Sequence, residues 1–125
     1  MSVTWLDGGP KRLTERAFQA RIIDAAHLFG WRVAHFRPAR TASGGWVTPV
    51  SADGAGFPDL VLVNPTMPDS EILYREVKTD RGRLTAEQAE WGAWLEARGG
   101  NWGVWRPQDW GSIMRTLSHG RVTVT

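Results

Sequence analysis

The sequence predicts a single α/β domain whose elements follow the order helix, strand, strand, strand, helix, strand. Apolar residues recur at helical spacing over residues 14–29 and 85–98. Short apolar runs typical of strands occupy residues 31–36, 56–63, 72–78 and 101–106. The chain has 125 residues, which is enough for one hydrophobic core, and no linker or repeat divides it.

The first helix is expected to begin after Thr14, which is a good N-cap residue, and to end at Gly30. Leu13 and Phe18 stand at the positions of a hydrophobic staple. Residues 1–12 are interpreted as a flexible lead-in. Residues 37–55 are long for a structureless loop, so this segment is expected either to be functional or to contain a short hairpin around Trp46-Val47, and we interpret it as a substrate-facing flap.

The second and third strands are predicted to form an antiparallel hairpin, because turn-forming residues occupy 64–70 between them. If the hairpin is centred between Met67 and Pro68, partner numbers sum to 135, and Asp59 faces Glu76. Lys78 projects to the same face because side chains alternate along a strand. Two facing carboxylates repel unless a positive charge lies between them, so this end of the hairpin is a candidate pocket for a divalent cation. The alternative is a turn followed by a solvated strand end.

The second helix is expected to begin at Thr85, which forms a capping box with Gln88, and to end at Gly99-Gly100. A fourth strand over 101–106 and a short helix over 107–117 follow, and residues 121–125 read as an edge strand. The tryptophans in these periodic segments are assigned to the core. They are Trp91, Trp94, Trp102 and Trp105.

Composition limits the kinds of site that the chain can hold. The chain has no cysteine, so disulfides and thiolate metal sites are excluded, and oxygen ligands favour Mg²⁺ or Mn²⁺. No apolar run is long enough to cross a bilayer and no secretory signal is present, so a cytoplasmic location and no membrane partner are expected. The net charge is +2, and basic residues crowd the first part of the chain. They are Lys11, Arg12, Arg16, Arg21, Arg32, Arg37 and Arg40.

The segments Gly56, Pro58-Asp59 and Glu76-x-Lys78 resemble the signature of the PD-(D/E)xK nuclease superfamily, and among its branches most resemble VRR-NUC domains. The resemblance extends from about Thr14 to Leu117, although the chain contains no Val-Arg-Arg triplet. It implies a restriction-endonuclease-like αβββαβ core with a mixed central sheet flanked by helices. It also implies a metal-dependent DNA nuclease.

The resemblance implies a role for each site residue. Asp59 and Glu76 would bind Mg²⁺, for which Mn²⁺ could substitute, and the carbonyl of Val77 would be a third ligand. Lys78 would orient the attacking water or stabilise charge on the phosphate. Glu15 has either a metal-related role or only a favourable place in the first helical turn. Gln88 either contacts Lys78 or a phosphate, or serves only as a helix cap.

Cationic side chains near these acids are candidate DNA contacts, although solubility alone would also account for them. Trp46 could stack on an unpaired base or anchor the flap. The basic candidates are Arg37, Arg40, Arg81 and Arg83. Two rivals to the nuclease stay open, namely a non-catalytic nucleic-acid-binding module and an interaction subunit with an idle site. A homodimer is one way in which so small a domain could make two cuts.

Overall fold

The computed structural model describes residues 13–36, 39–40, 46–47 and 52–119. Four strands form one sheet in the order β1-β4-β5-β6. They are β1 (Arg32–His35), β4 (Leu60–Val63), β5 (Leu73–Val77) and β6 (Asn101–Trp105). The first three strands in that order are antiparallel neighbours, whereas β6 runs parallel to β5. The sheet is therefore mixed, as predicted for a restriction-endonuclease-like core.

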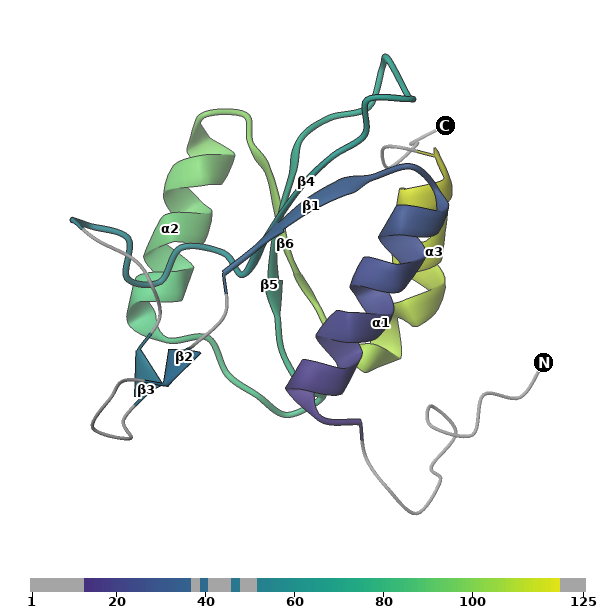
Figure 1. The fold of residues 1–125 in the computed structure, drawn as a ribbon. Coiled ribbons are helices and arrows are strands. Elements are labelled where there is room, and N and C mark those ends of the chain that lie inside the picture. Colours follow the sequence, from purple (N-terminus) through teal and green to yellow (C-terminus); the bar gives the residue numbers. More distant parts are fainter. Residues whose placement is uncertain (1–12, 37–38, 41–45, 48–51, 120–125) are drawn as a thin grey trace.

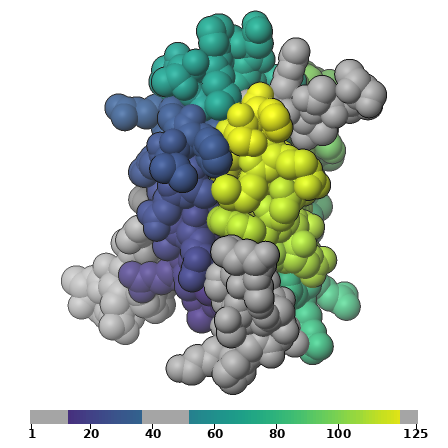
Figure 2. Space-filling view, turned by 90° about the vertical axis from the view of Figure 1, so that its right-hand side faces the viewer, coloured from purple at the N-terminus to yellow at the C-terminus, as the bar shows by residue number. Residues whose placement is uncertain are grey.

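Helices cover both faces of this sheet (Figure 1). Helices α1 (Glu15–Leu28) and α3 (Trp110–His119) lie on one face, and α2 (Ala86–Ala97) lies on the other. Figure 2 shows α1 and α3 side by side on the face that they cover. A 3-10 turn, η1 (Pro107–Asp109), connects β6 to α3. None of the helices in the described ranges is long and apolar enough to cross a membrane.

The hydrophobic core lies between the sheet and the α1–α3 layer. Burying these side chains removes apolar surface from water, which is the main force that holds the layers together. The indole N–H of Trp31 donates a buried 2.8 Å hydrogen bond to the Leu117 carbonyl and ties β1 to α3. The core residues are Phe18, Ile22, Ala26, Trp31, Leu60, Leu62, Leu73, Val77, Trp105, Ile113 and Leu117.

Both long helices begin where the sequence predicts. The hydroxyl of Thr14 accepts from the backbone N–H of Ala17 at 3.0 Å, and Leu13 packs against the core beside α1. Thr85 and Gln88 form the predicted capping box at the start of α2. Gly30 follows α1 with a φ of +92°, a conformation that glycine adopts without strain.

The hairpin has the predicted register. Leu60 pairs with Arg75 and Leu62 pairs with Leu73, so partner numbers sum to 135. Asn64, which is buried in the turn, donates to the Phe29 carbonyl at 2.9 Å. The turn is thereby attached to the end of α1, and the same register continued by one residue sets Asp59 opposite Glu76.

The predicted flap contains a short hairpin, in which β2 (Ala39–Arg40) pairs with β3 (Trp46–Val47). Its register joins Arg40 to Trp46. The predicted lead-in over 1–12, the edge strand over 121–125 and Arg37 lie outside the described residues.

Of the four tryptophans assigned to the core, Trp94 is exposed, Trp91 and Trp102 are half-buried, and Trp105 is buried. Trp105 is buried, but Trp94 is 53% exposed, and Gly92 is the buried residue of α2. The ring of Trp102 packs directly over Gly92, so α2 is seated on β6 by that contact. Trp91 instead lies at the rim, where its ring meets Phe57 and Trp94 edge-on. The helical spacing is correct, but the aromatic stripe forms a half-exposed cluster.

Candidate metal and catalytic site

Asp59 directly precedes β4. The strand begins at the end of the sheet that is nearest the N-terminal ends of α1 and α2 (Figure 1). The Asp59 carbonyl accepts from the Phe36 N–H at 3.0 Å, which joins it to the end of β1. Its carboxylate oxygen Oδ2 accepts from the Val77 N–H at 2.9 Å, which joins it to β5. The carboxylate is thus held against the strand that carries Glu76, while Oδ1 makes no such backbone contact.

Glu76 is a buried acid, with only 1% of its surface exposed. Its Oε2 accepts a 2.9 Å hydrogen bond from the side-chain amide of Gln88, at the start of α2. Its Oε1 is buried and has no hydrogen-bond partner in the structure. A buried carboxylate oxygen without a partner is costly, so this atom indicates a position where a proton or a cation is needed.

The electrostatics of the pair favour a proton on Glu76. Burial is the largest cause and raises the pKa of Glu76 to about 9, because the charged form is poorly solvated. The hydrogen bond that a protonated Glu76 can donate to Asp59, and repulsion from Asp59, raise this pKa further, whereas attraction to Lys78 lowers it. Near neutral pH, Glu76 therefore keeps its proton in the absence of a cation.

Lys78 and Glu15 belong to the same electrostatic group. The pKa of Glu15 is raised by loss of solvent around its carboxyl and by Asp59, and it is lowered by the charge of Lys78. Lys78 also acts on Glu76, and the Lys78 N–H donates to the Trp105 carbonyl at 3.0 Å. The structure thus brings together four predicted residues from α1, the start of β4 and the end of β5. They are Glu15, Asp59, Glu76 and Lys78.

Gln88 forms the helix cap, and its side-chain amide also contacts Glu76, a partner that the sequence did not predict. Its Oε1 accepts from the Thr85 N–H at 2.9 Å, which completes the capping box. Its Nε2 binds Glu76 rather than Lys78. The helix cap therefore also orients one of the two central acids.

The donor set fits a small divalent cation. The site has two adjacent carboxylates, one of which has an oxygen without a hydrogen-bond partner. Mg²⁺ is commonly bound by one or two carboxylates while water molecules fill its other coordination positions. Residues 13–36 and 52–119 contain no cluster of three or more His, Asp or Glu side chains arranged to hold a metal ion. Asp59 and Glu76 would therefore hold such an ion as a pair, with the Val77 carbonyl next to Glu76 as the further oxygen.

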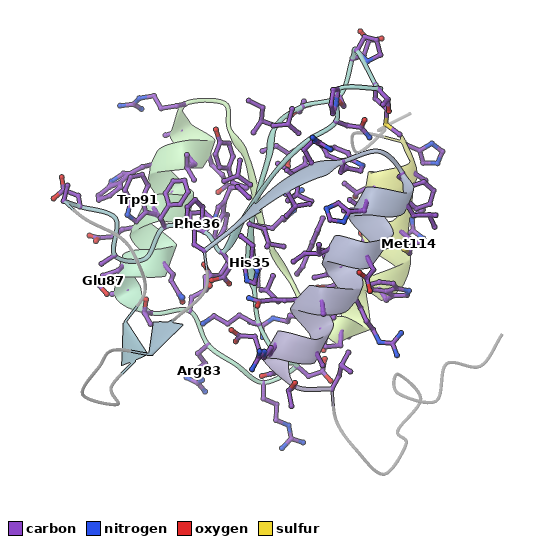
Figure 3. All side chains as sticks on the ribbon, viewed as in Figure 1. His35, Phe36, Arg83, Glu87, Trp91 and Met114 are labelled. Atoms are coloured by element: carbon purple, nitrogen blue, oxygen red, sulfur yellow. The ribbon has the colours of Figure 1, made fainter. Side chains whose placement is uncertain are left out.

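The predicted DNA contacts fall into two groups. Arg81 and Arg83 are exposed on the loop between β5 and α2, shortly after Lys78, and Figure 3 labels Arg83 there. Arg40 lies on β2 and Trp46 lies on β3, and the two residues are paired in this short hairpin. At the end of β1, His35 Nε2 lies 3.0 Å from the side-chain oxygen of Gln19 on α1.

Sequence reasoning missed one buried cation, Arg75. It is 4% exposed, donates to the carbonyl and side-chain oxygens of Asn101, and stacks over Trp105 with 4.9 Å between the guanidinium carbon and the ring centroid. Burial lowers the pKa of Arg75 to about 10. Strand alternation could have found it, since Leu73 and Val77 on either side face the core.

The family model of the VRR-NUC domain, a PD-(D/E)xK nuclease-like domain, matches residues 16–108. That range includes β1, the hairpin with Asp59 and Glu76, Lys78, α2 and β6. No curated protein and no solved structure matches the chain significantly.

Proposed function

The chain belongs to the VRR-NUC domain family, and on that premise we propose that it is a magnesium-dependent nuclease that hydrolyses phosphodiester bonds in DNA. Glu76 carries the proposal. It is buried, has one oxygen without a hydrogen-bond partner, and lies beside a second carboxylate at the end of the sheet that also bears Lys78. A buried acid beside a second, half-buried acid and a lysine is expensive for stability, and such groups cluster at functional sites.

Asp59 and Glu76 would hold Mg²⁺, or Mn²⁺ in its place, with the carbonyl of Val77 as an additional ligand. Bound there, the ion would polarise the scissile phosphate and lower the pKa of an attacking water. Gln88 would keep the Glu76 carboxylate oriented through its 2.9 Å hydrogen bond. The Val77 N–H does the same for Asp59.

Lys78 would orient the water or stabilise negative charge that develops on the phosphate. Glu15 would act from the first turn of α1, directly or through a water, because it is electrostatically linked to both Asp59 and Lys78. Phosphate contacts would come from the loop after Lys78 and from the flap. They are assigned to Arg81, Arg83, Arg37 and Arg40, and Trp46 would stack on an unpaired base.

The decisive experiment compares cleavage of labelled linear, flapped and four-way-junction DNA in Mg²⁺, Mn²⁺ or EDTA. Wild type should give products with Mg²⁺ or Mn²⁺ and none with EDTA, and Lys78→Ala should lose them. Lys11→Ala is the matched control, since positions 11 and 78 hold the two lysines of the chain. The control should cleave like wild type.

Binding without cleavage under every metal condition would overturn the nuclease and favour a non-catalytic DNA-binding module. Failure to bind any of the DNAs would favour an interaction subunit. Paired cuts in a four-way junction would call for two sites, which a homodimer would supply, and sedimentation of the active species would then give its subunit number.

A further inference from the structure

Arg106, the first residue after β6, reaches back to the loop that follows the catalytic strand. Its Nη1 donates to the Thr79 carbonyl and to the Gly82 carbonyl, both at 2.7 Å. Its own backbone N–H donates to Asp109 Oδ2 at 3.0 Å, so its main chain is fixed at the start of the 3-10 turn. One half-buried guanidinium therefore joins η1 to the β5–α2 loop.

The segment that Arg106 binds is a closed turn. The Gly82 N–H donates to the Thr79 carbonyl at 3.3 Å and to its hydroxyl at 3.0 Å. The carbonyls of Thr79 and Gly82 converge on a single cationic nitrogen, and hydrogen bonds from a charged donor are the stronger kind. Removing the guanidinium would leave these two carbonyls without a common donor.

The turn packs on the side chain of Lys78. A Cβ added at Gly82 would lie 3.4 Å from Lys78 Cδ and 3.0 Å from the Thr79 hydroxyl oxygen. Gly82 thus lies close to the aliphatic stem of the lysine. The Lys78 backbone N–H is bound by the carbonyl of Trp105, the residue before Arg106. The end of β6 therefore constrains Lys78 in two ways. Trp105 binds its backbone N–H, and Arg106 holds the turn that packs against the aliphatic part of its side chain.

We propose that Arg106 is a positioning residue that holds the Thr79–Gly82 turn against the stem of Lys78 and so directs its ammonium toward Asp59 and Glu76. Arg106 acts through the turn and does not touch DNA or metal. The catalytic part of this inference rests on the proposed nuclease function, whereas the structural part can be measured without cleavage.

The structural part is tested by NMR of the protein after reductive ¹³C-dimethylation of its lysines, which keeps their positive charge. Because lysine occurs only at positions 11 and 78, the spectrum contains two lysine signals, which Lys11→Arg and Lys78→Arg assign. Arg106→Gln should move and sharpen the Lys78 signal, as expected for a freer side chain. Arg115→Gln, on the exposed face of α3, should leave it unchanged. An unchanged Lys78 signal in Arg106→Gln would overturn the inference.

The catalytic part is tested by steady-state cleavage of the best DNA from the panel. Arg106→Gln should lower kcat about tenfold or more while KM changes less than about twofold, because misplacing a reacting group by about 1 Å has effects of that size. Arg106→Lys should recover part of kcat. In a Lys78→Ala background, Arg106→Gln should cause no further loss, since both changes remove the same contribution.

A raised KM with unchanged kcat, or losses that multiply in the double variant, would overturn the positioning role. If wild type cleaves nothing, the nuclease proposal fails, and the NMR comparison still decides whether Arg106 holds Lys78. If Arg106→Gln does not fold, Gly82→Ala disturbs the same contact from the loop side and should shift the same lysine signal.

Discussion

Glu76 shows how a single residue can be both a structural cost and a functional group. Its side chain is buried between β5 and the start of α2, and it is satisfied at Oε2 by Gln88 but not at Oε1. Its pKa is raised to about 9, mainly by burial, so the uncharged form is the stable one near neutrality.

The raised pKa of Glu76 makes the stability of the metal-free protein depend on pH. Between about 4.5 and about 9 the folded state holds a proton that the unfolded state releases, so the free energy of unfolding should fall as pH rises. One group contributes at most about 1.4 kcal/mol per pH unit. Urea unfolding of wild type in EDTA from pH 5 to 9 measures this slope.

Glu76→Gln supplies the comparison, because it keeps the shape of a neutral carboxyl. It should flatten the slope and be more stable than wild type at pH 8. Glu96→Gln, on the exposed surface of α2, is the control and should retain the wild-type slope. An equal slope in wild type and Glu76→Gln would contradict the assignment of the proton to this residue.

Mg²⁺ should bind more tightly as pH rises, because a carboxylate must lose its proton before it can act as a ligand. Binding should release a proton from Glu76 at pH 7. Calorimetric titrations in two buffers of different ionisation enthalpy measure that release directly. Asp59→Asn should abolish the heat of Mg²⁺ binding. Uptake of protons on binding by wild type, or an affinity for Mg²⁺ that falls as pH rises, would contradict the proposed ligand pair.

At the scale of elements, the sequence predicted what local rules determine. The N-caps Thr14 and Thr85 and the hairpin register follow from turn chemistry and strand alternation, and the structure has all three. It did not predict that Arg75 is buried or that Trp94 is exposed. The exposure of Trp94 depends on where α2 settles on the sheet, and that position is set by the contact of Gly92 with Trp102, which no local pattern encodes. Arg75 lies on the same strand face as Leu73 and Val77, so its burial follows from alternation, but its charge argues against a core position.

Gly92→Ala should destabilise the protein, although alanine favours helices. A Cβ there would lie 2.5 Å from the Trp102 ring, so α2 would have to move away from β6. Overpacking of this kind costs about 1–3 kcal/mol. Gly111→Ala in α3 is the matched control, because its Cβ would meet only Arg115 at 3.7 Å. It should stabilise by up to about 1 kcal/mol in urea unfolding. A stable Gly92→Ala variant would show that the helix is free to shift.

The two ends of the molecule differ in composition: one is held together by a buried polar side chain, and the other carries the candidate site. The turn over 64–70 and the C-terminal ends of α1 and α2 form one end, where buried Asn64 ties chain segments together. The other end carries the acids, Lys78 and the loop with the exposed residues Arg81 and Arg83, of which Figure 3 shows Arg83 extending from the molecule. Elements far apart in the sequence build that end jointly, so its electrostatics could not be derived from any one segment.

Replacing Arg81 and Arg83 together by glutamine should weaken DNA binding and flatten its salt dependence. Each phosphate contact contributes about 0.9 to the slope of log K against log salt, so two contacts would remove about 1.8. Binding is measured in EDTA to prevent cleavage. Arg98→Gln with Arg115→Gln removes the same charge elsewhere and should leave the slope unchanged. Equal effects of the two pairs would indicate a response to net charge alone.

The separation of the two ends makes the hairpin turn a place for a reporter. The chain has no cysteine, so Asp69→Cys would introduce a unique thiol on the exposed surface of the turn. The five residue-to-residue steps from Asn64 back to Asp59 span about 16 Å along the strand. A dye there would be distant from the acids yet rigidly connected to them through β4 and β5, so energy transfer to labelled DNA would report the approach of substrate without occupying its site.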